Sequence, residues 1–195
     1  MKVLKSYQLL LTGVFFMLLT AGSMVGQSFK MDSSSEIIVE GTSNIHDWEM
    51  KANSKNGSAT ITTEEGKLTG MPSLKVTVPA ESLDSGKGGM DKNAYKALNT
   101  NKYKNIEFQL DEVKNIEDKA ADSYQVKGLA SLKISGVTKQ VPVEFTVKLS
   151  GNKLQINGKQ QINMTHFKVD PPTAMFGTIT TGEELTIKFK STFTK

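Results

Sequence analysis

Residues 131–147, SLKISGVTKQVPVEFTV, hold two runs of alternating apolar and polar residues joined by a Ser-Gly pair. In the second run Val143, Phe145 and Val147 share one face, and polar residues occupy the other. Successive side chains of a strand point to opposite faces, so this period of two is typical of a strand with one buried face. The short connection predicts that the two strands pair as an antiparallel hairpin.

The same alternation extends along the chain on both sides of this hairpin. It predicts about eight or nine strands, and tight turns between neighbours favour antiparallel pairing. They are expected at residues 36–40, 47–52, 57–62, 73–79, 106–110, 124–135, 143–149, 153–163 and 185–190. Aromatic residues are only 7% of the chain, too few for the girdles of a membrane barrel, so the apolar face is expected inside. A closed barrel or a sandwich fits this pattern.

Two connections are longer than the turns. Residues 88–100, GGMDKNAYKALNT, are predicted to form one short helix with Asp91 as its N-cap. Residues 165–182 contain the pair Pro171-Pro172 but also several apolar residues. Long connections in compact domains are usually functional or disordered, and the apolar content favours a segment that packs over the fold as a lid.

The N-terminal segment, residues 1–27, is predicted to be a secretory signal peptide. Lys2 and Lys5 precede an uncharged apolar run over residues 9–21, and small residues follow it. An uncleaved anchor is the alternative, although the run is short for a bilayer span. Residues 28–35 are expected to be a polar lead-in to a single barrel domain at 36–195. The chain has no Cys and so no site for a lipoprotein anchor, and we expect a periplasmic or secreted protein.

Charge and motifs exclude several classes of function. The formal net charge is +4 and every basic residue is Lys, which indicates a mixed surface rather than a nucleic-acid footprint. The sequence contains no nucleophile elbow, phosphate loop, HExxH or Cys-based metal motif. We therefore predict neither an enzyme, nor a cofactor, nor a metal site.

One stretch, GTSNIHDWEM at residues 41–50, contains the only Trp and one of the two His residues. Residues 41–44 suit a turn, and a strand that starts after them would point His46 and Trp48 inward and Asp47 outward. Pleat geometry thus argues against a catalytic His-Asp pair. Trp48 is expected to plug one end of the barrel or to line its mouth.

Whether the lumen is open or filled is left undecided by the pattern. Gly128, Ala130 and Gly158 are small residues at inward positions, which would leave room in the middle of the barrel. Glycine in a strand can equally mark a bend at a barrel corner.

Several segments together resemble the YceI-like family, lipocalin-like barrels of exported bacterial proteins linked to polyisoprenoid binding. They are residues 131–147 around Gly-Val-Thr-Lys, LNTNKYKNIEF at 98–108, GTSNIHDWEM at 41–50 and INMTHF at 162–167. The sequence departs from the family pattern at Met164, where Arg is usual, at Lys168, where Gly is usual, and at Asn105, where Pro is usual.

The resemblance implies an all-β fold, an antiparallel eight-stranded lipocalin-like barrel with one short helix in a connecting loop. It also implies an apolar lipid ligand, a polyisoprenoid or an isoprenoid quinone; it does not specify the oligomeric state. The residues expected to line the lumen are Trp48, Phe108, Val126, Ala130, Leu132, Phe145, Ile156, Gly158, Ile162 and Phe189, with Met175 and Phe176 near its mouth.

Two other functions remain open from the sequence. One is a barrel with a filled core that acts through surface contacts in envelope upkeep or stress. The other is a hydrolase or isomerase that uses His46 or His166. An apolar cavity above about 300 Å³ would favour the lipid carrier, and a polar cluster containing both His residues would favour the enzyme.

Overall fold

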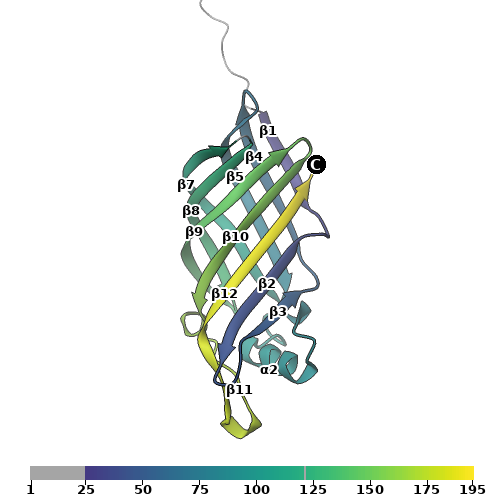
Figure 1. Cartoon of the computed structure of the whole chain (residues 1–195), viewed down its shortest axis with the longest axis vertical. Coiled ribbons are helices and arrows are strands. Elements are labelled where there is room, and N and C mark those ends of the chain that lie inside the picture. Colours follow the sequence, from purple (N-terminus) through teal and green to yellow (C-terminus); the bar gives the residue numbers. More distant parts are fainter. Residues whose placement is uncertain (1–24, 121) are drawn as a thin grey trace, which may run out of the picture.

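The computed structural model describes residues 25–120 and 122–195, which form an antiparallel barrel of long strands (Figure 1). The strands are β1 (Val25–Met31), β2 (Glu36–Ser43), β3 (Trp48–Ala52), β4 (Asn56–Glu64), β5 (Lys67–Pro79), β6 (Leu83–Asp84), β7 (Asn105–Ala120), β8 (Ser123–Ile134), β9 (Val137–Ser150), β10 (Lys153–Asn163), β11 (Thr173–Ala174) and β12 (Ile179–Thr194). The helical elements are α2 (Gly88–Leu98) and the 3-10 turns η1 (Ala80–Ser82), η2 (Met164–Phe167) and η3 (Met175–Gly177).

The ring of strands closes at β12, because β1 and β2 pair with successive parts of this one strand. Both pair with β12, β1 near Thr194 and β2 between Thr181 and Lys190. On their other side β1 pairs with β4 and β2 with β3. From β4 the order β5, β7, β8, β9, β10 leads back to β12, so that the sheet contains a ring of 8 strands. The predicted eight-stranded antiparallel barrel with one α-helix is confirmed for the described residues.

The hairpin of β8 and β9 forms as its sequence predicts. Ile134 pairs with Val137 across the turn, and the two turn residues Ser135 and Gly136 have φ angles of 49° and 78°. Positive φ at both central residues is the requirement of the type I′ turn, whose twist matches that of the flanking strands. The ring of Tyr103 packs on this turn, where a Cβ at Gly136 would lie 2.3 Å from a ring carbon.

Three local predictions differ from the structure. Residues 28–31, expected in a polar lead-in, belong to β1, in which Phe29 is buried and Met31 partly buried while Ser28 and Lys30 are exposed; this short alternation was not recognised. The helix begins after Lys87 rather than at an Asp91 N-cap, and Asp91 lies in its first turn. Residues 41–43, expected in a turn, continue β2.

The interior of the barrel differs between its two halves. The half away from α2 is packed with side chains that include Ile61, Val126, Val147, Leu154 and Phe193, each at most 1% exposed. In the half near α2 the buried residues form two smaller clusters, and α2 packs against both of them. A filled half and a looser half therefore share one barrel.

The inward glycines serve close packing instead of an open lumen. A Cβ at Gly128 would lie 2.2 Å from the carbonyl oxygen of Glu112, at a β-bulge in the facing strand β7. A Cβ at Gly158 would lie 2.6 Å from the ring of Phe189, which covers this position. Of the two alternatives that the sequence left open, room beside these two glycines is therefore not observed, because neighbouring atoms occupy it.

Candidate functional site

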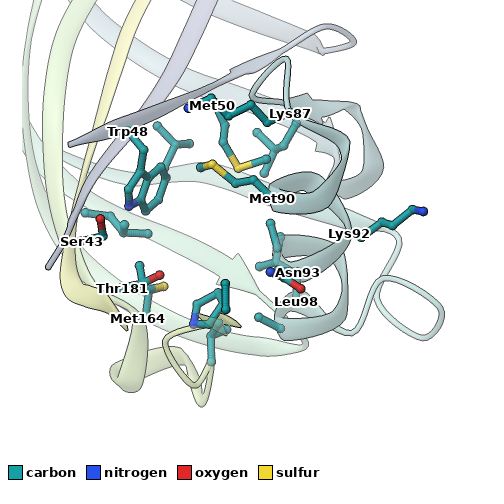
Figure 2. A pocket seen from close by; sticks show the side chains of 18 of the residues that line it. Ser43, Trp48, Met50, Lys87, Met90, Lys92, Asn93, Leu98, Met164 and Thr181 are labelled. Carbon is teal, nitrogen blue, oxygen red and sulfur yellow. The ribbon is translucent and has the colours of Figure 1, made fainter. Parts of the chain in front are cut away.

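A cavity of about 720 Å³ lies in the looser half, between α2 and the barrel wall. Figure 2 shows Trp48 and Met50 of β3 on one side of it and Met90 and Leu98 of α2 on the other. The apolar residues that line it are Ile37, Val39, Ile45, Trp48, Met50, Val78, Leu83, Met90, Ala94, Ala97, Leu98, Ile106, Ile134, Ile162, Met164, Phe167, Val169, Pro172, Ala174, Met175, Ile179, Leu185 and Ile187. Among the described residues that line it, none carries a carboxylate.

The helix α2 lies over one end of the barrel and forms one wall of the cavity. Its apolar residues recur at Met90, Ala94 and Leu98, one face of a helix, and this face packs on the cluster around Met50 and Leu83. The hydroxyl of Tyr95 lies 2.7 Å from the carbonyl oxygen of Leu83 and 3.0 Å from that of Glu81, and it can share its single proton between these two acceptors. These bonds fix the helix to the segment that leads into it.

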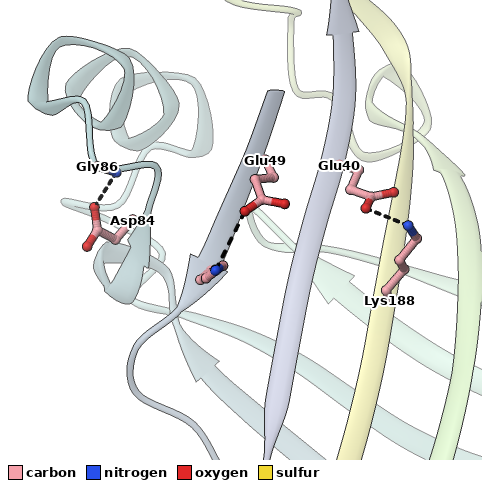
Figure 3. Close-up of polar contacts among 6 residues, drawn as sticks. Glu40, Glu49, Asp84, Gly86 and Lys188 are labelled. Carbon is pink, nitrogen blue, oxygen red and sulfur yellow. Dashed lines mark hydrogen bonds and ion pairs between the residues drawn. The ribbon is translucent and has the colours of Figure 1, made fainter. Parts of the chain in front are cut away.

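Asp91 and Asp84 hold the loop between β6 and α2. The backbone N–H and the hydroxyl of Ser85 donate to Asp91 at 2.9 and 2.6 Å. Asp84 accepts from the backbone N–H of Gly86 at 2.8 Å and from the amide of Asn53, and these bonds lower the pKa of its carboxyl below the usual value (Figure 3). The loop is therefore ordered by charge-assisted hydrogen bonds on the outside of the cavity.

Trp48 lines the cavity in a fixed orientation. Its partner across the β2–β3 ladder is Gly41, and a Cβ there would lie 2.2 Å from the indole ring. The indole N–H donates to the backbone carbonyl of Thr42 at 2.9 Å. Glycine at position 41 thus lets the indole lie flat on the strand, with its polar atom satisfied and its apolar ring facing the cavity.

A second, smaller cavity of about 120 Å³ lies deeper in the barrel. It shares four wall residues with the large cavity, namely Ile37, Val78, Ile106 and Ile187. These four side chains form a layer between the two spaces. Beyond the small cavity the packed half of the barrel begins, since Phe145, Ile156 and Phe193 belong to both.

The predicted lining residues are divided among four places. Trp48, Ile162 and Met175 line the large cavity. Phe108, Leu132, Phe145, Ile156 and Phe189 line the small one. Val126, Ala130 and Gly158 line neither, because neighbouring side chains fill the barrel around them. Phe176, expected near the mouth, lies outside the cavity and is fully exposed.

The lining residues that sequence reasoning missed come from the strands of the barrel wall, from α2 and from the connection after β10. Met90, Ala94, Ala97 and Leu98 come from a helix that was predicted but placed in a loop, and Val169 comes from the second long connection. The helical spacing of Met90, Ala94 and Leu98 was a usable signal. This spacing indicated that the helix has an apolar face, which must pack against another apolar part of the fold.

The His-Asp question is answered by the loop before β3. The prediction that His46 points inward beside Trp48 is wrong, because β3 begins only at Trp48 and His46 is exposed in the preceding loop. Its Nδ1 lies 2.8 Å from the backbone carbonyl oxygen of Asp47, not from the carboxylate. His46 lies at the edge of the large cavity, whereas His166 is exposed and does not line it.

Charged side chains pair on the outer surface of the barrel. Glu40 pairs with Lys188 between adjacent strands, and Glu49 pairs with Lys51 along β3 (Figure 3). The pKa of the Tyr95 hydroxyl is raised, mainly by desolvation. The negative charges of Asp91, Asp84 and Glu81 nearby raise it further. Two Lys residues, Lys87 and Lys92, border the large cavity, and Lys92 points away from it in Figure 2. The charged groups therefore lie on the outer surface of the barrel and at the border of the cavity, while the cavity wall is mainly apolar.

The described residues show neither a metal cluster nor a spanning helix. In residues 25–120 and 122–195 no three His, Cys, Asp or Glu side chains lie close enough to hold a metal ion. Within the same ranges, no helix combines the length and the hydropathy that crossing a membrane requires.

Comparison with known proteins places this geometry in a family. The family model of the YceI-like domain matches residues 28–193. BcnA of Burkholderia cenocepacia has a similar structure, with a TM-score of 0.63 and 20% identity over 83% of this chain and 98% of that one. A polyisoprenoid-binding domain from Saccharophagus degradans, implicated in plant cell wall breakdown, has a TM-score of 0.62 and 11% identity over 85% and 97% of the two chains. A comparison with curated protein sequences gives no match.

Proposed function

The chain belongs to the YceI-like domain family, and from this premise we propose that it binds an isoprenoid lipid chain in the cavity between α2 and the barrel wall. The protein acts as a carrier or binder of this chain and not as an enzyme. The chain class is a polyisoprenoid or the tail of an isoprenoid quinone, and the binding site is the large cavity rather than the middle of the barrel.

The observation that carries this proposal is the cavity itself. Its volume of about 720 Å³ is within the range of small-molecule sites, and its wall is formed mainly by aliphatic and Met side chains with one Trp. Such a wall can satisfy a hydrocarbon chain, but it offers few partners to a ligand rich in polar groups. The alternative of a wholly filled core is not supported by a space of this size.

The energetics favour a ligand of a few isoprene units. Burial of one five-carbon unit contributes up to roughly 4 kcal/mol, at about 0.8 kcal/mol for each carbon group. Ordering a flexible chain offsets part of this gain. Three or four buried units therefore suffice for tight binding without a charged headgroup contact. The name of the Saccharophagus degradans domain supports the isoprenoid class.

The single Trp gives a direct test of binding. Because Trp48 lines the cavity, its fluorescence should change when geranylgeraniol is added to the lipid-stripped protein, and the change should saturate. Palmitic acid, an unbranched chain, should bind more weakly. Mass spectrometry of lipids extracted from the protein purified without detergent should identify an isoprenoid. No saturable change with either lipid, and no co-purified lipid, would contradict the proposal.

We also propose that the protein is exported, as the N-terminal pattern predicts. Cleavage after Ser23 would leave β1 whole, whereas cleavage after Gly26 or Gln27 would remove its first residues. The intact mass of the protein from the cell envelope or medium should therefore correspond to loss of residues 1–23. Recovery of the full-length chain from the cytoplasm would contradict export.

A further inference from the structure

An apolar rim surrounds part of the mouth of the large cavity. Among the described residues, the large hydrophobic side chains that are exposed are Ile45, Met175 and Phe176, at 59%, 69% and full exposure. Ile45 comes from the loop between β2 and β3, and the other two come from η3 between β11 and β12. Ile45 and Met175 also line the cavity, so the apolar surface is continuous from its interior to the outside.

The two loops of this rim are fastened to each other. The side-chain amide of Asn44 donates to the carbonyl of Thr178 at 2.9 Å, and its oxygen accepts from the backbone N–H of Thr180 at 3.0 Å. The backbone N–H of Asn44 also donates to the carbonyl of Thr180. The exposed side chains are thus presented on one braced structure, which extends past the barrel at the end where α2 lies (Figure 1).

The backbone at the tip is held in a costly conformation. Met175 and Phe176 have φ angles of 51° and 57°, in the left-handed region that side chains other than Gly and Asn disfavour. Such strain persists where the surrounding structure imposes it and is concentrated at functional segments. The ring of Phe176 is fully exposed at this tip.

The segment around the tip carries no charge. Residues 171–182, PPTAMFGTITTG, contain no Asp, Glu or Lys, although charged residues are 23% of the chain. An uncharged segment with an exposed aromatic ring is suited to the boundary between headgroups and acyl chains of a bilayer. A soluble protein partner would more often be met by a polar rim around the apolar contact.

From these observations we propose that the rim of Ile45, Met175 and Phe176 inserts into a lipid bilayer and places the cavity mouth against its acyl chains. The ligand then passes between membrane and cavity without crossing water. This inference rests on the proposed lipid-binding function. It assigns to the exposed ring of Phe176 a role in docking rather than in holding the ligand.

Vesicles of phosphatidylcholine with phosphatidylglycerol test the inference. The wild-type protein should float with the vesicles, and Phe176→Ser should lower its partition by about tenfold, because burial of one large apolar side chain is lost. Lys67→Ser, in the hairpin at the opposite end of the barrel, is the matched control and should leave partition unchanged. Salt should have little effect, since the inserted segment is uncharged.

A second measurement locates the ring. In a Trp48→Phe background, Phe176→Trp should be quenched by phospholipids brominated on their acyl chains, and transfer of geranylgeraniol from vesicles should be slowed in Phe176→Ser. Binding of geranylgeraniol added from ethanol should be the same in Phe176→Ser and wild type, because Phe176 does not line the cavity.

Wild-type protein that binds the lipid from ethanol but never floats overturns the docking inference alone. Protein that floats but binds no lipid overturns the proposed function alone. A concentration-dependent dimer that Phe176→Ser dissociates, without flotation, would assign the rim to a second copy and overturn the inference.

Discussion

Phe193→Ala is expected to lower the free energy of unfolding by about 3–5 kcal/mol, as truncation of a fully buried Phe does. The side chain of Phe193 is 0% exposed in the packed half of the barrel, in the same cluster as Leu154, its partner in the β10–β12 ladder. Loss of the ring removes a side chain that has no exposed surface, and neighbours such as Leu154 can fill the space only in part. Urea unfolding followed by circular dichroism measures the change.

Phe189→Ala is the matched control for this experiment. Phe189 lies on the same strand and also points inward, but it is partly buried and borders the small cavity. Both rings border the small cavity, but that of Phe189 is also partly exposed, so its truncation loses less buried surface and we expect a cost of about 1–2 kcal/mol. Equal costs at the two positions would contradict the difference in burial between the two rings.

The strand pattern was predictable from the sequence because one physical requirement determines it. Each strand that has one face in the core and one in water must alternate, and tight turns such as Ser135-Gly136 leave only antiparallel pairing. β1 also alternates in burial, with Phe29 and Met31 facing the core and Lys30 exposed between them. It was missed because this apolar pattern is short and the polar residues 32–35 follow it directly.

The site was less predictable because alternation says which residues point inward and not how much space they leave. Gly158 looks like an opening in the sequence, yet the ring of Phe189 from the paired strand covers it. The wall that creates the large cavity comes from α2, which is distant in sequence from β2, β3 and β12. Its place over the barrel end depends on long-range packing, for which the apolar face of the helix was only an indirect signal.

The double substitution Ala94→Phe and Ala97→Phe is expected to abolish most lipid binding while the barrel stays folded. Both Ala residues lie on α2 and line the large cavity, so two rings would occupy space that the ligand needs. Displacing even one isoprene unit would forfeit up to roughly 4 kcal/mol of burial. We therefore expect the affinity for geranylgeraniol, measured by Trp48 fluorescence, to fall by at least about a hundredfold.

Lys96→Phe on the same helix is the control for this substitution. Lys96 is exposed and does not line the cavity, so a ring added there changes the helix composition without filling the site. We expect wild-type affinity in Lys96→Phe, and unchanged circular dichroism in both proteins, because rings that enter a pre-existing apolar space need not displace packed side chains. Wild-type affinity in a folded double variant would place the lipid outside the large cavity and contradict the site. Loss of affinity in Lys96→Phe as well would show that any Phe introduced on α2 disturbs the helix. A single Ala94→Met substitution would then separate filling of the cavity from disturbance of the helix.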